Sequence, residues 1–155
     1  MSKYLKDMES TFTETAIKIS DRHPNQPVIR TDREFLQSIA QYLKDTVGFD
    51  HVISVTVIDD IENDQFLIAY HLSSVQIVKL HGIVLTLELT VPRKSPHVPS
   101  LISIWSSVEF HEREGWEMFG VEFEGHPRLE RLLLPESWEG GNPLRKDFRL
   151  QEDPQ

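Results

Sequence analysis

Three glutamates and one histidine in the last third of the chain have side chains suited to proton transfer. Glu112, Glu114 and Glu117 lie close together, and His126 follows them. Carboxylates and imidazoles are common general acids and bases in enzymes. A stand-alone enzyme would also need a nucleophile or a metal ion, and neither is evident nearby. Catalysis by the isolated chain is therefore kept as an alternative, which activity of the purified protein would favour.

Metal and cofactor motifs are incomplete in this sequence. His111-Glu112 matches the start of a zinc-protease motif, but Gly115 stands where the second histidine is required. The chain has no cysteine, which excludes disulfides, thiolate metal ligands and cysteine-bound iron–sulfur clusters. No glycine loop has a nucleotide-binding pattern, and no serine forms a nucleophile elbow. We therefore expect the chain to bind no cofactor and no metal.

His126 precedes a proline and is expected in a turn. A histidine in such a turn commonly hydrogen-bonds the backbone, whereas a metal ligand would need two or three convergent partners. We interpret it as a structural residue.

Glu112 is expected on the apolar side of a helix that spans residues 106–119 and stops at Gly120. A carboxylate there must be paired or take up a proton. The preferred interpretation is an ion pair with Arg131 or Arg145. A contact with a partner subunit and a titrating catalytic acid remain open.

The segment from residue 136 to residue 155 combines bulky apolar and charged side chains. Those of interest are Trp138, Leu144, Arg145, Lys146 and Asp147. Aromatic and arginine side chains are frequent anchors at protein interfaces. We expect an extended docking tail, with wrapping around its own domain as the alternative.

The preceding sequence predicts the elements that position these residues. Thr31-Asp-Arg-Glu34 has the form of a capping box before a helix that Gly48 stops. Alternating or β-branched patterns predict strands, and a short helix is expected before Pro135. The strands are expected at Val52 to Ile58, Phe66 to Leu72, Val75 to Val91 (one strand or two) and around Val121 and Phe123, and the short helix at Arg128 to Leu134.

This order of elements is typical of an α+β fold: a single domain with an antiparallel or mixed sheet, helices on one face and an extended C-terminal tail. Residues 1–30 are expected to form an N-terminal extension, residues 31–135 the domain and residues 136–155 the tail.

Length and charge restrict the possible partners. A chain of 155 residues fits one domain. Its net charge of −9 makes a nucleic acid an improbable partner. The N-terminus lacks the apolar stretch of a secretory signal, and Glu88 interrupts the longest apolar run. Any contact with a membrane is expected to be made through other chains.

Residues 110–148 resemble the signature of the complex I 30-kDa subunit. Six pieces occur in the same order: Glu112-Arg113-Glu114, Met118-Phe-Gly120, Gly125-His-Pro127, Leu132-Leu-Leu-Pro135, Trp138 and Pro143-Leu-Arg-Lys-Asp147. Glu117 stands where the family usually has aspartate, and Glu130 where it has a basic residue or proline. These departures leave open which branch of the family the chain resembles most.

The resemblance implies a non-catalytic structural subunit in the hydrophilic arm of a complex I-like oxidoreductase. Such a complex passes electrons from NADH or another donor to quinone and translocates protons or ions. The resemblance implies docking against the quinone-site subunit, peripherally on the cytoplasmic side of the cell membrane. A membrane-bound hydrogenase and a deazaflavin-dependent quinone or phenazine reductase are alternative complexes. A stand-alone interaction module is the alternative from another class.

Overall fold

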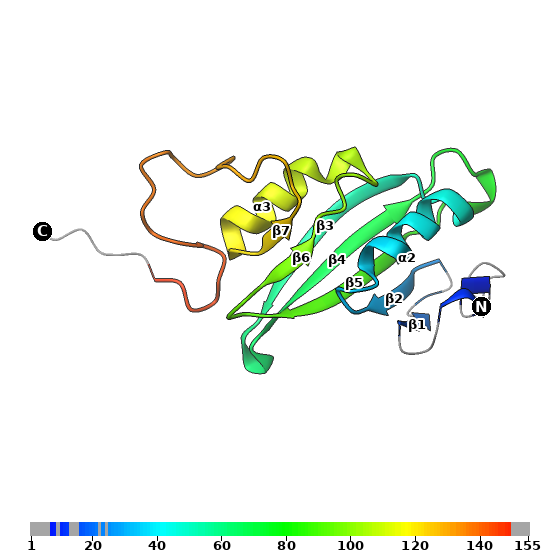
Figure 1. Ribbon diagram of the computed structural model, residues 1–155, viewed down its shortest axis with the longest axis horizontal. Coiled ribbons are helices and arrows are strands. Elements are labelled where there is room, and N and C mark those ends of the chain that lie inside the picture. The colour runs from blue at the N-terminus through cyan, green and yellow to red at the C-terminus, as the bar shows by residue number, and fades with distance from the viewer. Residues whose placement is uncertain (1–6, 9, 13–15, 22, 24, 150–155) are drawn as a thin grey trace, which may run out of the picture.

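A five-stranded mixed sheet, in the order β1-β2-β5-β4-β3, forms the centre of the molecule (Figure 1). The computed structural model describes residues 7–8, 10–12, 16–21, 23 and 25–149. The strands are β1 (Ile17–Asp21), β2 (Pro27–Thr31), β3 (His51–Asp60), β4 (Gln65–Ser73) and β5 (Leu85–Pro92). All neighbours pair antiparallel except β2 and β5, which pair in parallel.

Two helices lie over one face of this sheet (Figure 1). Helix α2 (Leu36–Tyr42) continues into a π-helical turn (Leu43–Val47) and ends at Gly48, whose φ of 100° is left-handed. Helix α3 (Glu109–Phe119) follows a 3-10 turn (Ser106–Val108) and ends at Gly120, whose φ is 76°. Both glycines are the expected stops, because glycine adopts positive φ without steric cost.

A second, two-stranded parallel sheet carries the chain into and out of α3. It consists of β6 (His97–Pro99) and β7 (Glu122–Glu124). Two further 3-10 turns, at Ile61–Asn63 and Val78–Leu80, lie in the connections that follow β3 and β4.

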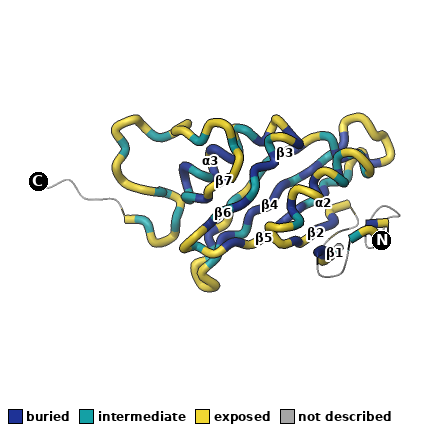
Figure 2. Tube along the Cα trace, in the orientation of Figure 1, coloured by how far each residue is buried: buried dark blue, intermediate teal, exposed yellow. Residues whose placement is uncertain are grey.

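The core lies between the main sheet and its helices, as the buried segments in Figure 2 show. Alternate residues of β4 and β5 face it, in agreement with the period-2 pattern of the sequence. These residues are Phe66, Ile68, Tyr70, Leu72, Leu85, Leu87, Leu89 and Val91. The α+β prediction, with a mixed sheet, is confirmed.

The predicted boundary between an N-terminal extension and the domain at residue 31 falls inside the main sheet. Strands β1 and β2 belong to that sheet, and Val28 aligns with Thr86 of β5. The capping-box prediction is wrong for a related reason. Thr31 is the last residue of β2, and its hydroxyl donates to the carbonyl of Ala16 at 2.8 Å. Helix α2 therefore begins later, at Leu36.

The long strand or strand pair predicted from residue 75 is shorter in the structure. Residues 75–84 form the 3-10 turn and its flanking bends, and only Leu85–Pro92 is a strand. No helix in the part of the chain that the structure describes is long and apolar enough to cross a bilayer.

Candidate docking surface and buried carboxylates

The acidic residues of helix α3 differ in their exposure to solvent. Within the expected triplet, Glu112 and Arg113 are buried and Glu114 is exposed. Glu117 is buried as well. Because successive helical residues are rotated by about 100°, residues that are adjacent in the sequence lie on different sides of the helix.

The carboxylate of Glu112 lies in the core, with 0% of the residue exposed. It accepts hydrogen bonds from the hydroxyl of Tyr70 at 3.2 Å, the hydroxyl of Ser100 at 2.5 Å and the N–H of Leu101 at 2.9 Å. Burial raises the pKa of Glu112 to about 7, and the three hydrogen bonds offset part of that rise. The donors come from β4 and from the turn after β6, so Glu112 ties α3 to both.

The two arginines expected to pair with Glu112 bind backbone carbonyls instead. The guanidinium of Arg145 donates to the carbonyl of Phe119 at 2.7 Å and lies over the ring of Phe66, 5.1 Å from its centroid. Arg131 donates to three carbonyl oxygens of its own segment, those of Pro135, Glu136 and Trp138. The predicted ion pair is therefore wrong, because carbonyl groups close to each arginine satisfy its guanidinium.

Glu117 organises the loop that follows β7. Its carboxylate accepts the N–H groups of Leu132, Leu133 and Leu134 at 2.9–3.2 Å. The predicted helix from Arg128 to Leu134 does not form. The backbone N–H groups of residues 132–134 bind the Glu117 carboxylate and not the carbonyls of a preceding helical turn. Sequence reasoning missed this role because the partners are 15 to 17 residues apart and no local pattern connects them.

Arg113 holds the carbonyl groups of the same loop. Its guanidinium, on a side chain only 5% exposed, donates to the carbonyls of Glu130 at 3.3 Å and Arg131 at 3.0 Å. It also lies 5.8 Å from the centroid of the Phe110 ring. Residues 128–135, called the anchored loop below, are thus fixed by a cation on their carbonyls and an anion on their amides.

The anchored loop and the adjacent helix face present large apolar side chains to solvent. Leu133 is 59% exposed, Phe110 54% and Leu132 37%. Figure 2 shows exposed chain through this region, in contrast with the buried part of α3. A backbone held in place beneath exposed apolar side chains favours binding of a partner, because the loop loses little conformational entropy on association.

His126 occupies the turn expected for it. Its Nδ1 accepts the N–H of Arg128 at 3.1 Å, and its Nε2 lies 3.2 Å from the carbonyl of Glu109. The first contact requires an unprotonated Nδ1, so Nε2 carries the proton and donates to Glu109. The imidazole joins the turn to the start of α3, as a structural residue would.

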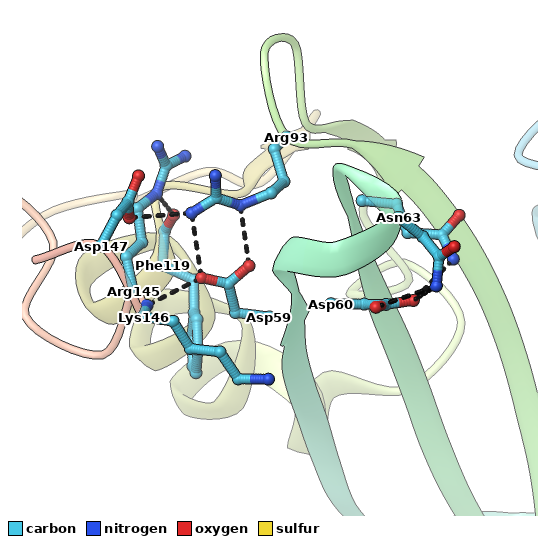
Figure 3. Close-up of polar contacts among 9 residues, drawn as sticks. Asp59, Asp60, Asn63, Arg93, Phe119, Arg145, Lys146 and Asp147 are labelled. Carbon is cyan, nitrogen blue, oxygen red and sulfur yellow. Dashed lines mark hydrogen bonds and ion pairs between the residues drawn. The ribbon is translucent and has the colours of Figure 1, made fainter.

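A buried ion pair holds the C-terminal segment against the main sheet (Figure 3). Asp59 of β3 accepts from Arg93 Nε at 2.8 Å, with side chains 1% and 11% exposed. Arg93 also pairs with Asp147 at 2.8 Å, and this contact lowers the pKa of Asp147. The N–H of Lys146 donates to Asp59 at 2.8 Å. Asp59 and Arg93 thus fix residues 146–147 to the edge of the sheet.

Neighbouring residues of the C-terminal segment make further contacts within the chain. The N–H of Leu144 donates to the carbonyl of Met118, while the Leu144 residue stays 53% exposed. The indole of Trp138 donates to Gly141 at 2.8 Å and its ring lies 6.0 Å from that of Phe148. Residues 142–148 therefore wrap around the domain, which was the alternative expected for residues 136–155. Residues 150–155 are not among the residues that the structure describes.

The described residues contain no group of three or more histidine, aspartate and glutamate side chains arranged to hold a metal ion. The face of the main sheet away from the helices forms an open groove of about 830 Å³. Arg30 and Glu88 form an ion pair in it.

Comparison with known proteins identifies the family. Residues 29–154 match the family described as respiratory-chain NADH dehydrogenase, 30 Kd subunit. The chain belongs to this family. The match covers most of the sequence, so it includes β3, β4, β5 and both helices as well as the signature after residue 110.

Relatives in this family are subunits of complex I-like oxidoreductases. A subunit of the F(420)H(2) dehydrogenase of Methanosarcina mazei is 31% identical over 144 residues, covering 93% of this chain and 89% of that protein. A subunit of the NADH-quinone oxidoreductase of Moorella thermoacetica is 30% identical over 154 residues, covering 99% and 98%.

Solved structures share the fold. A chain of the membrane-bound sulfane sulfur reductase, an archaeal respiratory membrane complex, has a TM-score of 0.82 at 20% identity, over 96% of this chain and 85% of that one. A trypsin-resistant fragment of Nqo5 has a TM-score of 0.69 at 25% identity, over 82% and 97%.

Proposed function

We propose that the protein is a non-catalytic docking subunit in the hydrophilic arm of a complex I-like oxidoreductase. It binds no redox cofactor and positions the subunit that forms the quinone site, on the cytoplasmic side of the membrane. The complex passes electrons from a reduced donor to quinone and couples this to proton or ion translocation. Family membership supports the complex, and the residues of α3 support the role.

The docking role rests on one observation: the buried charged groups of α3 bind other parts of this chain. In an enzyme, Arg113, Glu112 and Glu117 would be directed at a substrate. Here Arg113 and Glu117 hold the backbone of the anchored loop, and Glu112 ties the helix to the core. What remains facing outward is apolar, chiefly Leu133 and Phe110. Apolar and aromatic side chains at the centre of an interface supply much of its binding energy.

The electron donor has two candidates within this proposal. The relative from Methanosarcina mazei is named for a dehydrogenase of F(420)H(2), a reduced deazaflavin, and the one from Moorella thermoacetica for an oxidoreductase of NADH. Their identities of 31% and 30% to this chain are nearly equal. Both a reduced deazaflavin and NADH are therefore kept as candidate electron donors of the complex.

Replacing Leu133 by aspartate tests the docking role in the assembled complex. The side chain is 59% exposed, so Leu133→Asp leaves the fold intact while placing a charge in the proposed interface. Loss of a central anchor commonly costs about 2 kcal/mol, or about thirtyfold in affinity. We expect the tagged variant to be soluble and folded by circular dichroism but to co-purify poorly with the cluster-bearing subunits from solubilised membranes.

Val78→Asp is the matched control, because Val78 is 76% exposed on a different turn of the molecule. It should co-purify like the wild type. Full incorporation of Leu133→Asp would refute the anchored loop as the docking element. Native chain recovered without any cluster-bearing subunit would favour the stand-alone interaction module.

A further inference from the structure

One ionisable cluster lies in the core, beneath the proposed docking surface and out of reach of a partner. Glu112, Tyr70 and Ser100 are 0%, 0% and 3% exposed, and they come from α3, β4 and the residue that follows β6. Both oxygens of the Glu112 carboxylate accept hydrogen bonds, Oε1 from Tyr70 and Leu101 and Oε2 from Ser100. No ion pair of Glu112 occurs among the described residues.

We propose that Glu112, Tyr70 and Ser100 form a buried proton-binding site, in which the carboxyl group exchanges one proton with solvent. Its charge state then sets how firmly α3 is held on the sheet. On ionisation the carboxyl O–H bond breaks, the proton passes to solvent, and the anion keeps the three protein donors.

The physical basis is a balance between burial and hydrogen bonding. A carboxylate removed from water loses its hydration, which favours the neutral acid. The hydrogen bonds from Ser100, Leu101 and Tyr70 favour the anion, in decreasing order, but do not restore the ordinary pKa, and the value stands at about 7. Tyr70 remains a donor throughout, because burial and the neighbouring Glu112 raise the pKa of its hydroxyl well above the usual range.

Charged groups on the surrounding elements are occupied elsewhere. Arg113 on the same helix binds loop carbonyls, and Asp59 on β3 pairs with Arg93. Beyond these two, Lys44 after α2 donates to the carbonyl of Ile104, Arg33 before α2 pairs with Glu124 of β7, and Glu109 at the start of α3 pairs with Arg128. The carboxyl group of Glu112 therefore titrates against solvent and not against a fixed counter-ion.

The sign of the stability effect follows from the pKa. The pKa of Glu112 is 4.5 in the unfolded chain and about 7 in the folded one, so the folded chain binds more protons between these values. Stability should fall as pH rises from about 4.5 to about 7, with the unfolding equilibrium constant increasing by up to tenfold per pH unit, and level off above that. His71 acts in the opposite direction, because burial lowers its pKa below 6.5. A variant is therefore needed to isolate Glu112.

A direct test follows the carboxyl carbons of isotope-labelled glutamate by NMR during a pH titration of the full chain. Glu112→Gln identifies the resonance by removing it. We expect a midpoint near 7 in the wild type. Ser100→Ala should raise the midpoint more than Tyr70→Phe does, since the Ser100 hydroxyl is the stronger stabiliser of the anion. A midpoint near the ordinary glutamate value of 4.5 would overturn the proposal.

The stability of the chain gives an independent test. Urea unfolding is followed by tryptophan fluorescence, to which buried Trp105 contributes. It is measured from about pH 5 to pH 8 for the wild type, Glu112→Gln and the exposed control Glu114→Gln. The wild type and the control should lose stability with rising pH relative to Glu112→Gln. Identical pH dependence in all three would overturn the proposal. Should Glu112→Gln fail to fold, the wild-type resonance is assigned by its shift in Ser100→Ala, and the titration decides. Neither test involves the partner subunits, so their outcome is separate from that of the docking role.

Discussion

At the scale of single residues, Glu112, Glu114 and Glu117 of α3 show that the same side chain serves different purposes within a few positions. Glu112 is enclosed in the core, Glu114 faces solvent and Glu117 binds three successive amides. What separates them is the supply of donors around each carboxylate. A spacing argument treats the three alike, which is why the acid–base interpretation of the cluster arises from the sequence.

The first prediction concerns Glu117 and the anchored loop. Glu117→Gln keeps the shape of the side chain but removes its charge and one acceptor oxygen, leaving an N–H of residues 132–134 unsatisfied. Hydrogen bonds to charged groups contribute about 1.5–3 kcal/mol each, so a loss of stability of that size is expected. Hydrogen exchange at Leu132, Leu133 and Leu134 should accelerate. Glu114→Gln should change neither quantity, and unchanged exchange in Glu117→Gln would show that the loop is held by other contacts.

At the scale of elements, the close approach of α3 to the sheet depends on Gly115. A Cβ atom at this position would lie 3.1 Å from Val57 on β3 and 3.2 Å from the ring of Phe123 on β7. The helix can therefore sit low enough for Glu112 to reach Tyr70 only while residue 115 is small. Gly115 stands where the zinc-protease motif requires its second histidine, and the packing leaves no space there for an imidazole.

The second prediction is that Gly115→Leu destabilises the fold by about 1–3 kcal/mol, the usual cost of adding volume to a packed core. Glu114→Leu adds the same side chain at the preceding, exposed position and should change stability by less than about 0.5 kcal/mol. Urea midpoints of the two variants provide the comparison. Equal stability of the two variants would mean that α3 can shift away from the sheet at little cost.

At the scale of the whole molecule, Asp59 and Arg93 attach the C-terminal segment to the main sheet. This pair connects β3, the end of β5 and residues 146–147, the first of which lies 87 residues beyond Asp59 (Figure 3). The segment after the anchored loop is thereby part of the folded domain up to residue 148. Side chains of this segment that remain exposed, such as Leu144, are available for the proposed docking role.

The third prediction is that Asp59→Asn releases this segment. The substitution leaves Arg93 without its buried partner, and breaking a buried pair costs about 3–5 kcal/mol. Limited trypsin digestion should then cut after Arg145 and Lys146 much faster than in the wild type. Asp60→Asn is the control, because the hydrogen bonds that the Asp60 side chain accepts from side chains of the described residues come from Asn63 and Gln65, and Lys146 affects Asp60 only through its charge. Equal cleavage of Asp59→Asn and the wild type would show that the segment is retained without the ion pair.

The sequence by itself determined the features that depend on neighbours along the chain. The alternation of β4 and β5, the glycine stops at Gly48 and Gly120, the helical period of α3 and the turn at His126 all follow from local steric and periodic rules. The family signature after residue 110 was recognisable because its pieces keep their order along the chain. These features were enough to predict an α+β fold and membership of the 30-kDa subunit family.

Only the tertiary structure decided which distant groups meet. The parallel pairing of β2 with β5, the three donors around Glu112 and the amides held by Glu117 join residues far apart in sequence. Arg131 and Arg145 were plausible partners of Glu112 by charge, yet carbonyls near each of them compete successfully. Pairings of this kind depend on which groups the folded chain brings within hydrogen-bond distance, and that distance is a property of the packed molecule and not of residue type or spacing.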